Sequence, residues 1–244
     1  MLGRVLVLIV FLFLAIPALV AAHPAAQPAP PTRLFIPHIS RDLCGDFFDD
    51  FSAATGWFTG ERDGLLAELA DGEYRLLVTQ PGHIWMVGAP DCARHPTRAA
   101  VDARWVGRPG NFYGLLFAID GRLDQSYLLA VNSDARVWLV FRITPDSMAT
   151  VIEPTANDAI RPGNATNRLA VAPAGGRVLL SVNDTVVGQL PDPRPGAAVG
   201  VGLVAASHIT HVPADARFDN FAHQGVGGGA WRVAGGAWRV EEGQ

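Results

Sequence analysis

The feature that most constrains the fold is a regular alternation of short apolar runs with turn-forming residues along most of the chain. The runs are rich in Val, Leu and aromatic residues, which favour strands, and pairs such as Asp71-Gly72 and Asn183-Asp184 can supply tight turns between them. Only the brief stretch 63–69 has a pattern that an amphipathic helix could use. Many short strands at this spacing predict a sandwich or barrel. The predicted strands are residues 74–79, 99–106, 113–119, 126–131, 136–144, 168–172, 177–182, 199–205 and 217–222.

The N-terminal segment has the organisation of a secretory signal peptide. One positive charge precedes an apolar run over residues 5–20, and small residues follow it up to Ala22. A membrane-spanning helix needs about 20 apolar residues. The run is shorter and contains Pro17 near its end, which favours cleavage after Ala22 over the alternative of an uncleaved anchor. We therefore expect a signal peptide at residues 1–22 and a protein that is secreted or held at the cell surface.

The rest of the chain divides into three parts by composition. Residues 23–45 form a Pro/Ala-rich linker with a short extended segment, residues 46–224 hold the predicted strands and form the domain, and residues 225–244 are a Gly-rich tail. The tail contains Gly-Ala-Trp-Arg-Val twice, at 229–233 and 236–240. We expect a flexible appendage, because Gly-rich chain loses much entropy on ordering. A surface-binding or self-associating pair of strands is the alternative.

Cys44 and Cys92 are the only two cysteines of the sequence. In an exported chain, two cysteines without redox or metal-binding spacing predict a single disulfide. Two unpaired, buried thiols are the alternative.

The charge of the chain excludes one class of partner. The 19 Lys and Arg residues stand against 23 Asp and Glu residues, which gives a net charge of −4 at pH 7. Proteins that bind nucleic acid carry a basic surface, so we expect no nucleic-acid partner. Apart from the signal segment, we also expect no contact with a membrane.

Several segments in a fixed order together carry a family resemblance. They are Asp49-Asp50-Phe51-Ser52 with Gly56-Trp57; Gly72-Glu73-Tyr74-Arg75; Val101-Asp102-Ala103-Arg104; Tyr113-Gly114-Leu115-Leu116-Phe117; Asn167-Arg168-Leu169 with Val182-Asn183-Asp184; and Arg217-Phe218-Asp219-Asn220-Phe221. In these segments the chain resembles the concanavalin A-like lectin/glucanase jelly rolls, in particular the laminin-G-like and 3-keto-disaccharide hydrolase type domains of secreted bacterial proteins. The resemblance implies an all-β, two-sheet antiparallel jelly-roll sandwich whose first and last strands are adjacent. It implies no single chemistry, because this fold hosts lectins, hydrolases and inert modules.

The catalytic pattern of the jelly-roll glucanases is missing from the sequence. A retaining glycosidase needs two carboxylates about 5 Å apart, which those enzymes supply from a Glu-x-Asp-x-x-Glu strand. Asp102 has no second carboxylate two or four residues away, and the only such neighbour of Asp219 is Asp215, which we expect in the turn before the strand. We therefore assign no catalytic residue. Activity on keto-glycosides stays open, since the resemblance offers no local motif to transfer.

Three aspartates are candidate ligands for a structural calcium ion. The resemblance places Asp49, Asp50 and Asp219 on adjacent terminal strands, and carboxylate oxygens suit Ca²⁺. The alternative is that these side chains only cap the backbone in turns at strand ends. We expect no other cofactor.

A predicted hairpin offers a candidate saccharide site. If residues 126–131 and 136–144 pair across an even-residue loop, Tyr127, Trp138 and Arg142 share one face. The opposite face is apolar throughout, so we predict that it is the buried one. Tyr127 and Trp138 would then be exposed for stacking on a sugar ring, beside Arg142 and joined by Asp102 and Arg104 from another strand. The alternative is that Trp138 packs under a loop and Arg142 only solvates the surface.

Together these features predict an exported module that binds a polysaccharide or a cell-surface glycan without catalysis. A glycoside hydrolase of the keto-disaccharide type, with the same fold, is the alternative from another class. A structural adhesion module is the third interpretation.

Overall fold

A computed structural model describes most of the predicted domain. The described residues are 32–35, 46–90, 97–107, 109–120, 125–208, 213–225, 230–234 and 237–241. The predicted signal peptide and the two cysteines, Cys44 and Cys92, lie outside these residues. Within the described part of the chain, no helix is long and apolar enough to cross a membrane.

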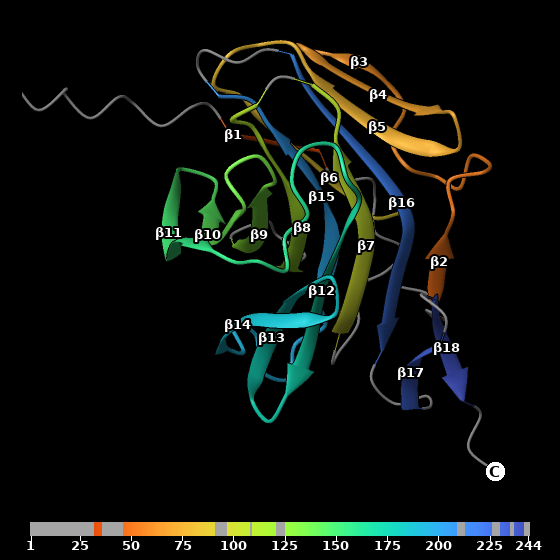
Figure 1. The fold of residues 1–244 in the computed structure, drawn as a ribbon, viewed down its shortest axis with the longest axis vertical. Helices are drawn as coiled ribbons and strands as arrows, with labels where there is room; N and C mark the ends of the chain where they lie inside the picture. Colours follow the sequence, from red (N-terminus) through yellow and green to blue (C-terminus); the bar gives the residue numbers. More distant parts are fainter. Residues whose placement is uncertain are drawn as a thin grey trace, which may run out of the picture.

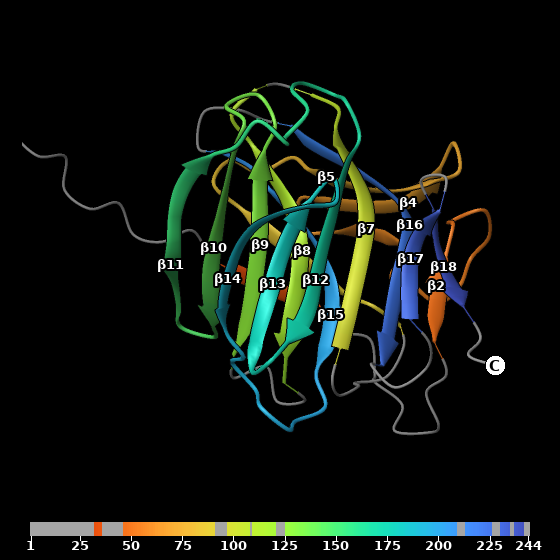
Figure 2. The same ribbon diagram turned by 60° about the horizontal axis from the view of Figure 1, so that its bottom comes forward.

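Apart from one two-stranded hairpin in the C-terminal tail, the described strands form two sheets that pack face to face (Figures 1 and 2). The seven-stranded sheet has the order β1 (Thr32–Phe35), β6 (Ile84–Gly88), β15 (Gly200–Ala206), β8 (Phe112–Ile119), β9 (Ser126–Asn132), β10 (Val137–Thr144) and β11 (Ser147–Ala156). The nine-stranded sheet has the order β14 (Thr185–Pro191), β13 (Arg177–Val182), β12 (Asn167–Ala174), β7 (Thr97–Trp105), β16 (Ala214–Gly225), β5 (Glu73–Val78), β4 (Leu65–Ala70) and β3 (Gly60–Arg62), with β2 (Phe47–Asp49) paired to β16. The predicted antiparallel jelly-roll sandwich is confirmed, and among the described strands β1 alone pairs in parallel, with β6.

Each run that the sequence predicted as a strand overlaps a strand of the structure. The predicted adjacency of the first and last strands of the domain is also confirmed, since Phe221 of β16 pairs with Asp49 of β2. The short helical pattern at 63–69 is wrong, because Leu65–Ala70 is strand β4. Leu65 and Ala67 point into the core with a period of two, and the turn Asp71-Gly72 joins β4 to β5 in a hairpin.

The main core fills the space between the sheets. Strand β5 shows why, because its buried and partly buried residues alternate along its length and Tyr74, Leu76 and Val78 all face inward. Tyr74 stacks on Phe51 at 5.4 Å between ring centroids, and Trp57 packs against both rings. A second cluster of buried apolar residues, including Met86, Leu116 and Leu128, is separate from this core.

The hairpin of β9 and β10 has the predicted register but the opposite orientation. Trp138 pairs with Val131 and Arg142 with Tyr127, as the parity argument required. Trp138 is only 3% exposed, however, and Tyr127 9%, and both belong to the core between the sheets. The prediction that Tyr127 and Trp138 are exposed is therefore wrong. The opposite face of the hairpin lies in the second apolar cluster, so both faces of these strands are buried and their polarity could not identify the inner one.

Gly188 of β14 explains how the Trp138 indole fits between the sheets. A Cβ atom added to Gly188 would lie 2.2 Å from Cη2 of Trp138, so the two are in direct contact. The missing side chain leaves the space that the indole fills.

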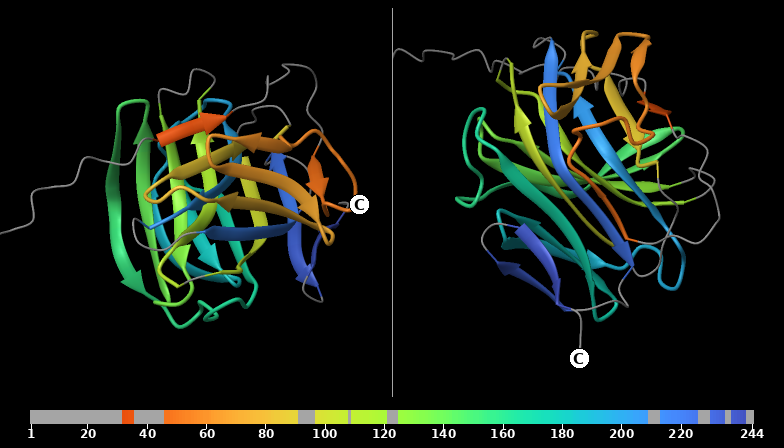
Figure 3. Two further views of the ribbon diagram at one scale, coloured as in Figure 1. Left: turned by 90° about the horizontal axis from the view of Figure 1, so that it is seen from above. Right: turned by 90° about the vertical axis from the view of Figure 1, so that its right-hand side faces the viewer.

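The two Trp-containing repeats of the tail pair with each other. Strands β17 (Ala230–Ala234) and β18 (Ala237–Glu241) form a separate antiparallel two-stranded sheet (Figure 3).

Candidate functional site on the outer face of the larger sheet

The outer face of the nine-stranded sheet carries three of the charged side chains that the sequence singled out, Asp102, Arg104 and Asp219. On β7, Val101, Ala103 and Trp105 are buried in the core. Asp102 and Arg104, which alternate with them, must therefore point away from the core. The same alternation places the charged residues of β5 and β16 on this face.

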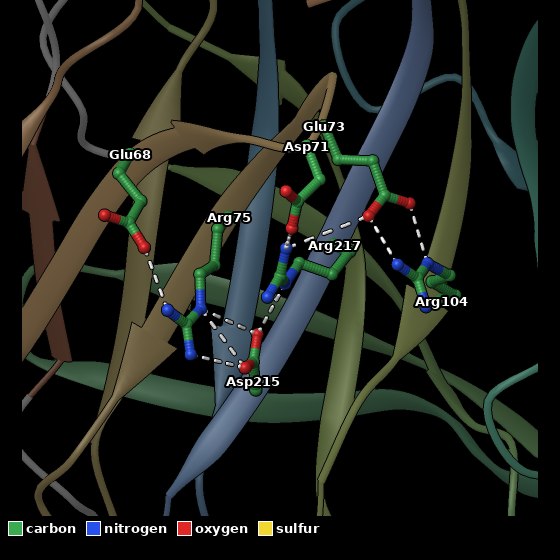
Figure 4. A network of polar contacts seen from close by, with 7 residues as sticks. All are labelled: Glu68, Asp71, Glu73, Arg75, Arg104, Asp215 and Arg217. Carbon is green, nitrogen blue, oxygen red and sulfur yellow. Dashed lines mark hydrogen bonds and ion pairs between the residues drawn. The ribbon is translucent and has the colours of Figure 1, made fainter.

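One part of this face is a network of ion pairs over β4, β5, β16 and β7 (Figure 4). Arg75 donates to both carboxylate oxygens of Asp215, from Nε to Oδ1 at 3.2 Å and from Nη2 to Oδ2 at 2.7 Å, and from Nη1 to Glu68 at 2.8 Å. Arg217 donates from Nε to Asp215 at 3.0 Å. Arg104 donates to both oxygens of Glu73.

These guanidinium groups are already occupied by carboxylates. Hydrogen bonds to Glu73 raise the pKa of Arg104, and hydrogen bonds to Asp215 and Glu68 raise the pKa of Arg75. A ligand that used Arg104 would have to displace Glu73, which holds the guanidinium in a bidentate pair. The network is therefore best understood as a fixed polar surface that ties four strands together.

A pocket of about 290 Å³ opens on the neighbouring part of the same face. Its floor is a row of small residues that pair across four strands: Ser181 of β13, Ala170 of β12, Ala100 of β7 and Ala222 of β16. Ala is depleted in strands because it packs little surface. A row of three alanines facing outward leaves a hollow in the sheet, where other residues would place a side chain.

Two arginines stand in the lining of this pocket, Arg98 on β7 and Arg168 on β12. Arg168 donates from Nη1 to Asp102 at 2.8 Å. The Nε atoms of both arginines are buried and have no hydrogen-bond partner. A buried donor without an acceptor costs about 1 to 3 kcal/mol, so a ligand oxygen at either position would be favoured.

Asp184 and Val186 complete the pocket on its β13–β14 side. Asn183 and Asp184 form the two-residue turn of this hairpin, with φ of 49° and 64°. Both residues tolerate the left-handed region, and the turn is the type that the sequence predicted there.

Beside the pocket, Asp102 and Asp219 lie directly opposite each other on β7 and β16. Side chains in such positions have Cβ atoms about 4.5 to 5.5 Å apart. The amide of Asn220 donates from Nδ2 to Asp102 at 3.0 Å and to Asp219 at 3.1 Å, so a single nitrogen joins the two carboxylates. Asn220 has φ of 50° and lies where the register between β16 and β7 shifts, and this β-bulge directs its side chain over the pair.

The environment of Asp219 favours its protonated form. Partial burial raises the pKa of Asp219, and the nearby negative charges of Asp102, Glu73 and Asp50 raise it further, against a hydrogen bond from the backbone of Asn220 that lowers it. Arg168 and Asn220 both donate to Asp102. The two carboxyl groups of the pair therefore have different environments.

The raised pKa of Asp219 gives a prediction for Asp219→Asn. A carboxyl whose pKa is higher in the folded than in the unfolded protein stabilises the fold while it is protonated. This stabilisation is complete below the unfolded pKa, about 3.9, and it is lost as the pH rises through the folded pKa. Ionised Asp219 thus opposes folding at neutral pH, so Asp219→Asn is expected to raise the melting temperature at pH 7 and to lose this advantage towards pH 3. Melting curves of both proteins from pH 3 to pH 8 test this. A variant that melts below the wild type at pH 7, or a difference independent of pH, would contradict it.

The structure separates the predicted ligand-binding residues. Tyr127 and Trp138 are in the core, and a buried ring cannot stack on a saccharide. Arg142 is exposed on the other sheet, whereas Asp102 and Arg104 lie on the outer face of the nine-stranded sheet. These five residues do not form one site.

The candidate calcium ligands are engaged in local hydrogen bonds. Asp49 is 2% exposed and accepts hydrogen bonds from the backbone N–H of Phe51, the indole N–H of Trp57 and the hydroxyl of Thr55. Asp50 accepts from the backbone of Ser52. Among the residues that the structure describes, no group of three or more His, Cys, Asp or Glu side chains could hold a metal ion. The turn-capping alternative therefore describes Asp49 and Asp50, and we do not propose a calcium site.

Arg98, Arg168 and Asn220 are among the residues of this face that the sequence did not single out as site residues. The available signal was the alternation of charged residues with alanines on β7, where Arg98, Ala100 and Asp102 occupy successive outward positions. That pattern becomes informative only when the neighbours of β7 are known, because the pocket floor is made by three other strands as well.

The likeness of this chain to known proteins lies in its fold. No family model matches it, and no curated protein matches it in sequence. Among solved structures it is similar to a β-glucanase of Bacillus licheniformis, with a TM-score of 0.52 and 13% identity over 74% of this chain and 98% of that one. It is also similar to a Bacillus subtilis protein of unknown function with a galectin-like fold, with a TM-score of 0.54 and 15% identity over 73% of this chain and 94% of that one. A third is the κ-carrageenase of Pseudoalteromonas carrageenovora in complex with an oligotetrasaccharide of κ-carrageenan, with a TM-score of 0.52 and 10% identity over 77% of this chain and 97% of that one. At these identities the likeness concerns the fold, and the fold is that of the concanavalin A-like glucanases and lectins.

Proposed function

We propose that this chain is an exported, non-catalytic module that binds glycan in the pocket on the outer face of its nine-stranded sheet. The observation that carries the proposal is the combination in that pocket of a small-residue floor with polar walls. Ligand sites are typically concave, mostly apolar, and fitted with a few polar groups that fix orientation. The row Ala170–Ala100–Ala222 offers a surface on which the C–H face of a sugar ring can lie, while Ser181, Gln224 and Arg98 can meet its hydroxyl groups.

The size of the pocket and the solved structures support a saccharide. A volume of about 290 Å³ is at the lower end of the range for small-molecule sites, which fits one or two sugar rings. The glucanase and the carrageenase named above, which have this fold, act on glycans. Export is supported by the organisation of residues 1–22, which is typical of a signal peptide.

The decisive experiment is a glycan array with the protein secreted by a bacterial host, repeated with Ala170→Leu. Leu at this partly buried, outward position would fill the pocket without entering the core, so we expect bound glycans to be lost while the melting temperature stays within a few degrees of the wild type. Thr150→Leu on the exposed edge strand β11 is the matched control and should bind as the wild type does. If Ala170→Leu binds the same glycans equally well, the pocket is not the site. If no glycan binds the wild type, the function itself is refuted.

The carboxylate pair favours a second candidate function, hydrolysis of glycosides. A census of carboxylates along single strands missed Asp102 and Asp219, because the pair forms between strands. Facing residues of a sheet have Cβ atoms about 4.5 to 5.5 Å apart, which is compatible with the carboxyl separation of about 5 Å in retaining glycosidases. A carboxyl with a raised pKa suits a general acid. Two observations nevertheless favour binding. Arg168 and Asn220 already donate hydrogen bonds to Asp102, and neither Asp102 nor Asp219 belongs to the lining of the pocket.

A panel of chromogenic glycosides, including 3-keto-glycosides, separates the two functions. Hydrolysis that both Asp102→Asn and Asp219→Asn abolish, with the fold retained, would establish the enzyme and overturn the non-catalytic assignment. No release of the chromophore by the wild type would exclude hydrolysis of the glycosides tested, and glycan binding would remain.

A further inference from the structure

Arg98 is a charged residue of the pocket whose Nε has no hydrogen-bond partner among the residues that the structure describes. It lies in the lining, opposite Gln224 on the neighbouring strand. Its Nε atom is buried and makes no hydrogen bond, and no ion pair joins its guanidinium to a carboxylate of the described residues. This differs from the other charged part of the face, where Arg75, Arg104 and Arg217 each hold at least one carboxylate.

The local balance of charge in the pocket is positive on the side of Arg98. Arg168 is neutralised by Asp102, to which it donates at 2.8 Å. The only carboxylate in the described lining is Asp184, an exposed residue in the turn between β13 and β14. Arg98 belongs to the middle of the sheet, on the far side of the alanine row from Arg168, and among the described lining residues its end of the pocket has a cation and no carboxylate. Asp46, which accepts from Nε2 of Gln224 at 3.4 Å, is the nearby carboxylate and lies outside the lining.

From this geometry we infer that the pocket selects acidic sugars, with Arg98 as the residue that binds the carboxylate of a hexuronic acid unit. The inference rests on the proposed glycan-binding function and names its ligand class. A guanidinium presents its N–H donors in a planar fork that matches the two oxygens of a carboxylate. The buried Nε–H of Arg98 would gain the acceptor that it lacks.

The rest of the pocket fits the remainder of such a sugar. The ring can lie over Ala100 and Ala170, whose apolar methyl groups neither donate nor accept hydrogen bonds. Ser181 and Gln224 stand at positions where they can meet ring hydroxyl groups. The unpartnered Nε–H of Arg168 at the other end offers a donor to a second hydroxyl or to the next sugar.

Calorimetric titration with two matched oligosaccharides tests the inference. The probes are β-1,4-linked glucuronate oligomers and cello-oligomers of equal length, which differ only in the carboxylate at C6. We expect the glucuronate oligomer to bind, with an affinity that falls as salt is added, and the cello-oligomer to bind at least about tenfold more weakly. Arg98→Gln, which keeps a polar side chain and removes the charge, should weaken glucuronate binding at least about tenfold and leave cello-oligomer binding unchanged. Arg142→Gln, at an exposed arginine of the other sheet, is the matched control and should change neither affinity.

The outcomes separate this inference from the proposed function. Equal affinity for both oligomers, or an unchanged affinity in Arg98→Gln, overturns selection for acidic sugars while the glycan-binding function stands. Binding of a sulfated oligosaccharide with no binding of glucuronate overturns the carboxylate as the recognised group. If Arg98→Gln fails to fold, Ala170→Leu replaces it, since a filled pocket must also abolish glucuronate binding; retained binding in that variant overturns the site. Failure of every glycan to bind the wild type refutes the proposed function instead.

Discussion

Trp138→Ala is expected to lower the free energy of unfolding by about 3 to 5 kcal/mol, the range for truncating a large aromatic side chain in a core. Trp138 is 3% exposed and fills the space between β10 and Gly188 of β14. Truncation would leave a cavity between the two sheets that neither backbone can readily close. Urea denaturation of the two proteins measures the difference. A loss below about 1 kcal/mol would show that the indole is not packed between the sheets.

Two matched variants make this result specific to the contact. Phe48→Ala removes an aromatic ring that is 62% exposed, so it should change stability by no more than about 0.5 kcal/mol. Gly188→Ala would place a methyl group against the indole and should cost about 1 to 3 kcal/mol in the wild type. In the Trp138→Ala background the same methyl group enters the cavity, so the cost should disappear or reverse. Additive losses would show that Gly188 and Trp138 do not share one space.

The strands of this fold could be predicted because their sequence signals are local. In β5 and β13 alternate residues are buried and the turns that follow or precede them contain Gly, Asn or Asp in left-handed conformations. The strands that were missed lack such a signal. Strand β6 is buried along its whole length, the apolar Val186 and Val187 of β14 are followed by Gly188, and β11 is mostly exposed at the sheet edge. Burial on both faces, or on neither, removes the period of two.

For the same reason, the sequence could not identify which face of the β9–β10 hairpin points between the sheets. Parity gave the correct set of residues on each face, as the pairing of Trp138 with Val131 shows. Which face is inner depends on what packs against each one, and here both are apolar and buried. Trp138 was interpreted as exposed because it shares a face of the strand with Arg142. In the structure Arg142 is exposed near the end of β10, whereas Trp138 and Val140 on the same face are buried in the core.

The candidate site depends on contacts between strands that are distant in the sequence. Asp102 and Asp219 are opposite each other only because β7 and β16 are neighbours, and Asn220 bridges them only because the bulge turns its side chain back. The pocket needs β13 and β12 in addition. No spacing along the chain indicates these contacts, so the sequence could predict charged outward residues on β7 but not what surrounds them.

Asn167→Ala is expected to lower the free energy of unfolding by about 3 kcal/mol, because it removes a buried amide on which several other groups depend. Asn167 is 0% exposed. Its Nδ2 donates to the hydroxyl of Tyr113 at 2.9 Å and to the carbonyl of Arg161 at 3.0 Å, and its Oδ1 accepts from the backbone of Arg161 and from Asn183, both at 2.8 Å. Alanine would leave these partners unsatisfied inside the protein, where each lost bond costs about 1 kcal/mol and an orphaned buried group more.

The same substitution should also disturb the pocket, because Asn167 precedes Arg168 and holds the turn that carries Asp184. Asn183 donates to Asn167 and accepts from the backbone of Arg168, so the amide of Asn167 fixes one end of the lining. Urea denaturation gives the stability, and the glycan titration gives the binding. Asn164→Ala, at an exposed position of the same loop, is the matched control and should change stability by no more than about 0.5 kcal/mol. Equal effects of the two substitutions would mean that the amide network does not order this end of the sheet, and that the position of Arg168 and Asp184 has another cause.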